Sequence, residues 1–520
     1  MNEPVSQQQV FALLADPAPH PATQPATYGG AAVERIDTHA ASVFLAGDRA
    51  FKVKRAVRFP FLDYSTLEKR KGACEAELEV NRAFAPDIYL RVVPITRETD
   101  GRLALDGDGA PVEWAVEMRR FDEKATLDHL ADAGLIDAAL ADALGRVVAA
   151  AHAGAPVVEA EPWIRALADY VEQNDAAFRQ RPELFPGADV DALTHASRAA
   201  HGRIRRLHLA REQRGLIRRG HGDLHLGNIV LIDRRPVLFD AIEFDPLVAS
   251  GDVLYDLAFL LMDLAERGLK DAANIVFNRY LAETGRPEDL DALAGLPLFL
   301  SVRAAIRAKV TAAKLEQAQA EGRAAIEAGA RKYFGFARAL IAPAAPKLIA
   351  VGGLSGTGKS VLARALAPDI APTPGAVVLR TDVERKTLFG KDEHDKLPTD
   401  AYSADVTARV YAAVADKARS AVAAGHSAIV DAVFAKARER AAIEQCAQAL
   451  GVPFHGLFLD ADLATRVGRV GARSRDASDA DAAVALTQES YDLGVLDWTR
   501  VDASGTPDDT LTRARAALDR

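Results

Sequence analysis

This 520-residue sequence lacks several features that are typical of secreted proteins, of membrane proteins and of proteins stabilised by a structural metal ion. It has only two cysteines, Cys74 and Cys446, which form no C-x-x-C pair, so neither a disulfide framework nor a zinc site is expected. Both thiols are expected to be small buried side chains. The N-terminus has no basic segment followed by an apolar run, and apolar stretches such as residues 254–264 are broken by Asp256 and Asp263. These absences favour a cytoplasmic protein without a membrane segment.

A basic surface is also lacking. The net charge is −9 and there is no long lysine or arginine run, which argues against nucleic acid as a partner. Hydrophobic residues make up 49% and charged residues 26% of the chain, an ordinary globular balance. At this length, roughly two to four structural units are expected. There is no repeat of fixed period.

The pattern along the chain divides it into an irregular lead-in (1–29), a first domain (30–340), a proline-containing linker (341–346) and a second domain (347–520). In the first domain, two strands at 43–46 and 50–55 join at Gly47-Asp48, and a helix over 65–84 is expected to begin at Ser65. Further strands are expected at 89–95 and 112–118, followed by mostly helical sequence. After the linker, strand and helix signals alternate, which predicts a parallel α/β sheet.

The strongest motif lies at the start of the second domain. Residues 353–360 fit G-x-x-x-x-G-K-[ST] at every position, between an apolar strand and a helix. In such a loop the backbone N–H groups surround phosphate oxygens, Lys359 reaches the β- and γ-phosphates, and the Ser360 hydroxyl can hold Mg²⁺. The predicted phosphate-binding residues are Gly353, Leu354, Ser355, Gly356, Thr357, Gly358, Lys359, Ser360 and Val361.

Other polar residues of the second domain follow predicted strands. Asp382 and Arg385 come after a strand at 376–380, and Asp431 ends a strand at 427–430. Asp431 stands where a carboxylate near Mg²⁺ is expected, and Asp382 could accept a proton from a substrate hydroxyl. An arginine-rich stretch, which could form a lid over a transferring phosphoryl group, contains Arg466, Arg469, Arg473 and Arg475. The alternative interpretations are a solvated helix face for the arginines and a strand-end turn for Asp382.

With these motifs, residues 347–505 resemble the P-loop small-molecule kinases related to gluconate kinase and the zeta-toxin-type kinases. The resemblance implies that Asp382 and Arg385 form a substrate-facing D-x-x-R and that Arg469 and Arg473 are the lid arginines. It also matches Arg440 to a recurrent arginine that follows the third strand, implying a substrate-binding role.

A second motif lies in the first domain. Residues 221–228 have the form H-x-D-x-x-x-x-N, the spacing of a kinase catalytic loop, in which Asp223 would orient the acceptor hydroxyl and Asn228 would bind Mg²⁺. His221 is expected to brace the loop rather than to act as a base. A strand at 236–239 follows and ends at Asp240, which is placed to hold Mg²⁺ between phosphates.

A cation for the α- and β-phosphates is expected on the strand at 50–55. Its sequence resembles the V-A-I-K strand of kinases, which favours Lys54, with Lys52 on the same strand face as the alternative. Glu77 is the preferred ion-pair partner among the glutamates of the next helix. No G-x-G-x-x-G precedes the lysines, so His39 and Ser42 are candidates for phosphate contacts.

Residues 30–330 thus resemble the aminoglycoside phosphotransferase and choline kinase group. This resemblance implies a two-lobed protein-kinase-like fold, with an N-lobe at about 30–118 and a helical C-lobe at about 119–340. The whole chain resembles bacterial fusions labelled as bifunctional aminoglycoside phosphotransferase and ATP-binding protein. The fold class implied is multidomain, α+β for the kinase-like part and α/β for the P-loop part, with ATP and Mg²⁺ as cofactors.

The leading hypothesis is an enzyme with two ATP-dependent kinase centres that phosphorylate hydroxyl groups of small molecules. One alternative is an antibiotic-modifying kinase, for which Glu243, Asp245 and Asp252 could supply an acidic pocket. Another is a nucleotide-dependent regulator in which one domain binds ATP and gates the other. No nucleic-acid or membrane partner is expected, and the sequence leaves the acceptor and the oligomeric state open.

Overall fold

The computed structural model describes residues 5–20, 32–59, 62–316, 318–472 and 477–518. The chain forms two compact units, residues 1–167 with 208–260 and residues 168–207 with 261–520. The kinase-like motif lies in the first unit and the phosphate-loop motif in the second. Within the described ranges, no helix combines the length and the hydropathy that crossing a bilayer requires.

The first unit contains a six-stranded antiparallel sheet in the order β1-β2-β3-β8-β6-β7. The predicted hairpin at Gly47-Asp48 is present as β2 and β3. The strands are β1 (Glu34–Asp37), β2 (Ala41–Ala46), β3 (Arg49–Lys54), β6 (Tyr89–Arg97), β7 (Leu103–Leu105) and β8 (Ala110–Arg119).

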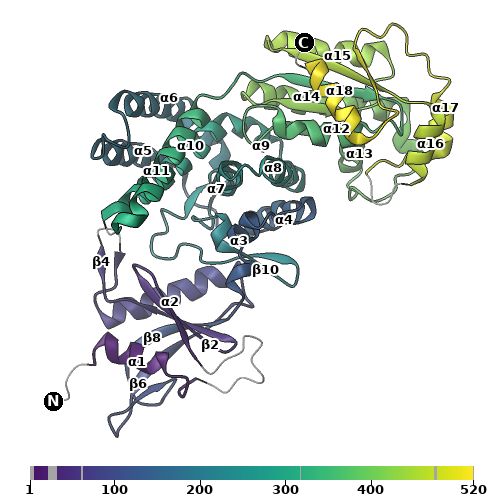
Figure 1. Cartoon of the computed structure of the whole chain (residues 1–520). Coiled ribbons are helices and arrows are strands. Elements are labelled where there is room, and N and C mark those ends of the chain that lie inside the picture. Colours follow the sequence, from purple (N-terminus) through teal and green to yellow (C-terminus); the bar gives the residue numbers. More distant parts are fainter. Residues whose placement is uncertain (1–4, 21–31, 60–61, 317, 473–476, 519–520) are drawn as a thin grey trace. The chain divides into compact units, whose positions relative to one another are not determined.

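One helix packs on each face of this sheet (Figure 1). Helix α1 (Gln7–Ala15) packs Phe11 against Phe44 and Phe51 on one face, although the sequence predicts an irregular lead-in there. A Ser6–Gln9 capping box and the apolar spacing of its buried residues explain this short helix. Helix α2 (Leu67–Arg82) packs on the other face. Because side chains alternate along β3, its two lysines lie on the α2 face.

The N-cap of helix α2 lies one residue later than predicted, and the helix covers 67–82 instead of 65–84. The hydroxyl of Thr66, not that of Ser65, accepts the N–H of Lys69 at the start of the helix. Ser65 instead donates to Asp63. The remaining elements of this unit are β4 (Arg58–Phe59), β5 (Leu62–Asp63), α3 (Leu127–Asp132), α4 (Ala138–Gly154), β9 (Ile217–Arg219), β10 (Ile229–Ile232), β11 (Arg235–Leu238) and β12 (Ser250–Asp252). Residues of both units occur in α5 (Ala160–Arg179), α6 (Gly187–Glu212) and α7 (Val253–Glu266).

The second unit contains the predicted parallel sheet, with the strand order β14-β15-β13-β16-β17. Its central strand β13 is buried at every position, as its continuous apolar sequence requires. The strands are β13 (Leu348–Gly353), β14 (Val377–Arg380), β15 (Ala428–Asp431), β16 (Phe454–Asp460) and β17 (Thr499–Asp502). The helices after β13 are α12 (Lys359–Leu366), α13 (Thr381–Leu388), α14 (Ala404–Ala423), α15 (Ala437–Leu450), α16 (Leu463–Gly471), α17 (Ala482–Gln488) and α18 (Pro507–Leu518).

A helix from before the predicted linker completes one edge of this sheet. The amide oxygen of Asn278 accepts the N–H of Val378 at 2.7 Å, and its amide nitrogen donates to the carbonyl of Ala376 at 3.1 Å. Asn274 donates to the same carbonyl at 3.1 Å. Both asparagines belong to α8 (Lys270–Thr284), which is followed by α9 (Pro287–Asp291), α10 (Leu296–Ala313) and α11 (Ala320–Ile341).

Candidate functional sites

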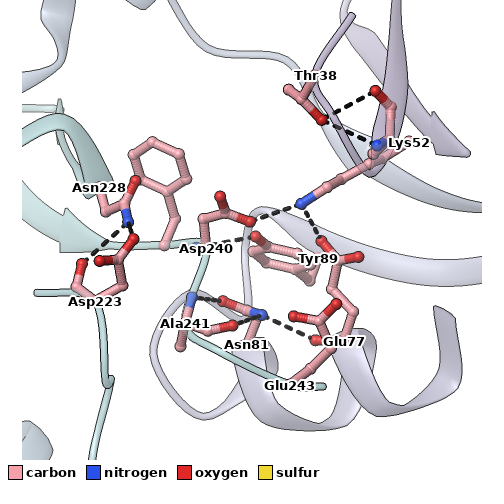
Figure 2. Close-up of polar contacts among 12 residues, drawn as sticks. Thr38, Lys52, Glu77, Asn81, Tyr89, Asp223, Asn228, Asp240, Ala241 and Glu243 are labelled. Carbon is pink, nitrogen blue, oxygen red and sulfur yellow. Dashed lines mark hydrogen bonds and ion pairs between the residues drawn. The ribbon is translucent and has the colours of Figure 1, made fainter. Parts of the chain in front are cut away.

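The predicted catalytic loop lies between β9 and β10, and its two polar residues are bonded to each other. The Asn228 amide donates at 3.0 Å to both the carbonyl and the Oδ2 of Asp223 (Figure 2). Nε2 of His225 lies 3.4 Å from the same Oδ2. Asn228 is buried, whereas the carboxylate of Asp223 is 39% exposed and lines a cavity. The hydrogen bond from Asn228 therefore holds Asp223 in place and leaves its carboxylate accessible.

A buried carboxylate holds the beginning of this loop. Asp256, on α7, accepts the backbone N–H groups of His221 at 2.8 Å and Gly222 at 3.0 Å. Nε2 of His221 bonds the carbonyl of Phe239 at 2.9 Å, and burial lowers the pKa of this imidazole. Gly222 has a φ of +81°, and a Cβ there would lie 2.9 Å from the backbone of Ala249. A neutral His221 therefore braces the loop, and the turn requires glycine.

The lysines of β3 form a row of alternating charges with three carboxylates, of which Figure 2 shows the contacts of Lys52 with Asp240 and Glu77. Lys52 Nζ lies 2.6 Å from Asp240 and 2.7 Å from Glu77. Lys54 Nζ lies 2.6 Å from the other oxygen of Glu77 and 2.5 Å from Glu243. Burial raises the pKa of the Glu77 carboxyl, but the two ammonium groups outweigh it and lower the value to about 2. Similarly, burial opposes the charge on both lysines, yet the surrounding carboxylates raise both pKa values. Glu77 and the two lysines are therefore charged at neutral pH.

The two lysines have different partners beyond Glu77. Lys52, the alternative in the sequence prediction, is the one bonded to Asp240, whereas the preferred Lys54 is bonded to Glu243 and lies 5.4 Å from the ring of Tyr64. A missed signal distinguishes them: Ala50 stands two residues before Lys52, as alanine does before lysine in V-A-I-K. Ala50 and Lys52 both line the cavity.

The segment that carries Asp240 is held by the N-terminal lobe. Asn81 of α2 donates to the carbonyl of Ala241 at 3.2 Å and accepts its N–H at 2.7 Å. The hydroxyl of Tyr89 accepts the N–H of Asp240 at 3.1 Å. Asp240 itself has a φ of +59° and its side chain is 44% exposed. These bonds position a carboxylate opposite Asp223.

A cavity of about 460 Å³ joins these groups. Asp223, Asp240 and Lys52 lie on its polar side, and apolar side chains from β1, β2 and the segment after β8 line much of the rest. His39, a candidate for phosphate contacts, lines the cavity, whereas the buried hydroxyl of Ser42 donates to Asp37 at 2.7 Å. In place of a glycine-rich loop, residues 38–40 close the cavity between β1 and β2.

The phosphate loop of the second unit connects β13 to α12, as predicted. The Nζ of Lys359 donates to the carbonyl of Leu354 at 3.1 Å, which curls the side chain over its own loop. Gly356 has a φ of +88°, and a Cβ there would lie 2.5 Å from the carbonyl of Arg466. The side chain of Val361 has no hydrogen-bond donor, and its backbone N–H donates to the carbonyl of Gly358 at 3.1 Å, so its phosphate contact stays a prediction. The loop thus has the concave backbone that binds phosphate.

The predicted metal ligands of this loop lie against each other. The hydroxyl of Ser360 donates to Oδ2 of Asp431 at 2.5 Å. Arg380, not singled out in the sequence, contacts both residues. Burial, with the negative charge of Asp431, raises the pKa of Asp382 above its ordinary value, so this carboxyl is a stronger base than an exposed aspartate.

Two of the arginines predicted at this site bind backbone instead. Arg440 is buried, and its guanidinium donates to the carbonyls of Phe434, Ala435, Leu493 and Val495 at 2.7–2.9 Å. Arg469 donates to the carbonyls of Ala503 and Gly505, at 2.7 and 2.6 Å. These guanidinium groups hold loops together, an arrangement that does not favour the predicted substrate and lid roles, which stay predictions. Arg473 lies outside the described residues.

Arg385 remains beside the predicted acceptor region. It is buried, donates to the carbonyl of Ala401 at 2.7 Å and lies 4.9 Å from the ring of Tyr402. Its Nε is buried without a hydrogen-bond partner. Gln488 of α17, which belongs to no sequence motif, accepts the N–H of Ser355 at 2.6 Å through its side chain. Arg466 of α16 contacts the carbonyl of Ser355 and pairs with Glu489, so this lid-segment arginine reaches the loop instead of Arg469.

Two family models match the chain in the order that the motifs predict. The model described as "Phosphotransferase enzyme family" matches residues 40–296, and the model described as "AAA domain" matches residues 348–491. The uncharacterized protein Rv2004c of Mycobacterium tuberculosis is 31% identical over 485 residues, which cover 90% of this chain and 92% of the relative. The chain belongs to the family of this protein. The uncharacterized protein Mb2027c of Mycobacterium bovis, another member, matches with the same identity and coverage.

Solved structures resemble the two parts of this family separately. A choline/ethanolamine kinase family protein from Mesorhizobium loti covers 64% of this chain and 99% of its own, at 15% identity and a TM-score of 0.36. A gluconokinase from Sinorhizobium meliloti covers 34% of this chain and 93% of its own, at 21% identity and a TM-score of 0.26. Because both TM-scores are low, these similarities assign no role to any residue of this chain.

The family models and the geometry together show the enzyme class and the fold of the chain. It is a phosphotransferase enzyme with a kinase-like N-terminal domain and a P-loop kinase domain built on a parallel sheet. The fold class and the enzyme class predicted from the sequence are thereby confirmed.

Proposed function

We propose that both domains are working kinase centres, each of which transfers the γ-phosphate of ATP to a hydroxyl group of a small molecule. The observation that carries the proposal is the row of Lys52, Glu77 and Asp240 facing the Asp223–Asn228 pair across one cavity. Kinase chemistry needs a cation for phosphate oxygens, carboxylate and amide oxygens for a metal, and a carboxylate for the acceptor. All of these groups line or border that cavity.

At the N-terminal centre, Lys52 would bind phosphate oxygens of ATP, and Glu77 would hold its ammonium in place. Asp223 would orient the acceptor hydroxyl and receive its proton. The Asn228 hydrogen bond keeps Asp223 in one orientation, which matters because most of the rate enhancement in phosphoryl transfer comes from positioning and electrostatics.

The oxygen donors of Asn228 and Asp240 fit Mg²⁺, which prefers carboxylate and carbonyl oxygens. The Asp240 carboxylate lines the cavity and pairs with Lys52. When bound, Mg²⁺ would neutralise charge on the phosphates. Among the described residues, no group of three or more histidine, cysteine and acidic side chains could hold a metal ion. Mg²⁺ at this site would therefore also need water and phosphate oxygens as ligands.

At the C-terminal centre, the backbone of residues 353–360 and Lys359 would bind phosphates, and Ser360 and Asp431 would hold Mg²⁺. Asp382 would receive the proton of the acceptor hydroxyl, a role that its raised pKa supports. Arg385, whose Nε has no partner in its buried position, would bind an anionic or carbonyl group of the acceptor.

The antibiotic-modifying alternative receives less support. A pocket for a cationic drug needs free carboxylates, but Glu243 is neutralised by Lys54 and Asp252 by Arg211, at 2.5 and 2.6 Å. Asp245 accepts the N–H of Leu247 at 2.8 Å in its own turn. We therefore favour metabolites as acceptors.

The test follows label from [γ-³²P]ATP into a small-molecule extract, with the full-length chain and the variants Asp223→Asn and Lys359→Ala. A product lost only with Asp223→Asn belongs to the N-terminal centre, and one lost only with Lys359→Ala belongs to the C-terminal centre. Matched controls are Asp233→Asn and Lys391→Ala, which remove exposed charges and should retain every product. If ATP binds but no small molecule is labelled, the proposal is wrong and the regulator alternative takes its place.

A further inference from the structure

An arginine side chain fills the space between the two residues that would hold the metal of the P-loop domain. The Arg380 Nη2 donates to the hydroxyl of Ser360 at 3.0 Å, and its Nε donates to Oδ2 of Asp431 at 3.2 Å. Ser360 donates to the same Oδ2 at 2.5 Å, which closes the triangle. The side chain of Arg380 is 11% exposed and that of Asp431 is 5% exposed.

The strand register explains this position. Strands β14 and β15 are parallel neighbours in which Arg380 pairs with Asp431, so both side chains leave the sheet at its carboxyl end. The phosphate loop follows the next strand, β13, at the same end of the sheet. A guanidinium at this register position therefore reaches Ser360 and Asp431 without any special loop conformation.

The contacts also account for the charge of Asp431. A nearly buried carboxylate needs a cation or several hydrogen bonds, and here Arg380 and Ser360 supply them. Magnesium held by Ser360 and Asp431 would compete with Arg380 for the Ser360 hydroxyl and for Oδ2 of Asp431. A positive guanidinium beside the ion would also repel it.

We propose that Arg380 is an internal cation that stands in for Mg²⁺ in the P-loop domain, and that the metal entering with the nucleotide displaces it. This inference rests on the proposed function of the C-terminal centre. Arg380 keeps Ser360 and Asp431 close together before the nucleotide binds, and it competes with the ion for them. The competition raises the Mg²⁺ concentration that nucleotide binding requires at this site.

The experiment measures binding of a fluorescent ATP analogue to the full-length chain over a series of MgCl₂ concentrations. The protein carries Asp240→Asn to weaken metal binding at the N-terminal site, and only the signal that disappears with Lys359→Ala is assigned to the P-loop. We expect Arg380→Gln to lower the half-maximal Mg²⁺ concentration about 10-fold, equivalent to about 1.4 kcal/mol. Arg380→Lys should give a smaller decrease, because an ammonium cannot donate to both oxygens in the same planar geometry.

Arg364→Gln is the matched control. It removes an exposed arginine that also contacts residue 360, but at the backbone carbonyl, and it should leave the Mg²⁺ dependence unchanged. Thermal melting of each variant checks that it is folded. If Arg380→Gln does not fold, the comparison is made with Arg380→Lys.

Two results would overturn the inference while leaving the proposed function intact. One is an unchanged Mg²⁺ dependence in both Arg380 variants, and the other is weaker nucleotide binding at every Mg²⁺ concentration, which would make Arg380 a permanent phosphate ligand. If Lys359→Ala removes no signal at all, the nucleotide does not bind at the P-loop. That result contradicts the proposed C-terminal centre itself.

Discussion

The ammonium nitrogen of Lys52 lies 2.6 Å from Oδ1 of Asp240, a residue 188 positions later in the chain. This contact joins the strand that would bind phosphates to the segment that would bind the metal. Lys54, two residues further along the same strand, makes the equivalent contact with Glu243. One strand therefore provides a partly buried cation, Lys52, and a buried one, Lys54, with different partners, and substitution can separate their roles.

Lys52→Ala should reduce turnover at the N-terminal centre roughly 10²- to 10³-fold, because it removes an electrostatic contact to the phosphates. Lys54→Ala should act mainly on stability and cost about 3 kcal/mol, because it removes the ammonium that pairs with Glu243 and with one oxygen of Glu77. Product formation under saturating ATP and thermal melting measure the two effects. If Lys54→Ala abolishes turnover without lowering the melting temperature, the assignment of Lys52 is wrong.

Glu77 should make stability depend on acidic pH. Because its folded pKa of about 2 lies below its ordinary value of 4.5, its contribution is complete above pH 4.5 and is lost as the pH falls towards 2. Glu77→Gln should therefore lower the melting temperature at neutral pH, and the difference from the parent should shrink between pH 4.5 and 2. Glu75→Gln, an exposed glutamate of the same helix, is the control. A difference that stays constant over this pH range would contradict the ion-pair assignment.

Arg440→Ala should destabilise the P-loop domain by about 3 kcal/mol, because several buried carbonyl groups lose a charged donor. Arg440→Lys should restore little of the lost stability, since one ammonium cannot reach carbonyls on two different loops. The exposed Arg438→Ala serves as the control. Thermal melting checks the prediction, and a normal melting temperature combined with a raised KM for the acceptor would restore the substrate-binding role predicted from the sequence.

The parts of the sites that are predictable from sequence lie within short segments. Asp223 and Asn228 are five residues apart in one loop, and their hydrogen bond follows from that local geometry. The phosphate loop is predictable for the same reason, because glycine spacing and the flanking strand and helix dictate its backbone. Asp240 and Asp431 are predictable because each ends an apolar strand.

The remaining assignments depend on partners that are distant in the chain. Lys52 and Lys54 share one face of β3, and only the positions of Asp240 and Glu243 distinguish them. Arg440 matches the spacing of a substrate arginine, but its acceptors include the carbonyl of Leu493, which is 53 residues away. A guanidinium binds a carbonyl as readily as a phosphate, so its spacing alone does not reveal which it contacts. Arg380 was missed because its role follows from the register of two strands.

The asparagine contacts of α8 bear on how this protein can be divided. Strand β14 is the outermost member of its sheet, and Asn278 occupies a backbone donor and a backbone acceptor on it. Cutting the chain at residues 341–346 would remove α8 and expose the edge of β14, with backbone hydrogen-bonding groups that Asn278 now occupies. Open edges recruit strands from other molecules. A fragment that starts at residue 347 should therefore self-associate, so its isolated behaviour would misrepresent the P-loop kinase, whereas a fragment that starts before α8 keeps the edge sealed.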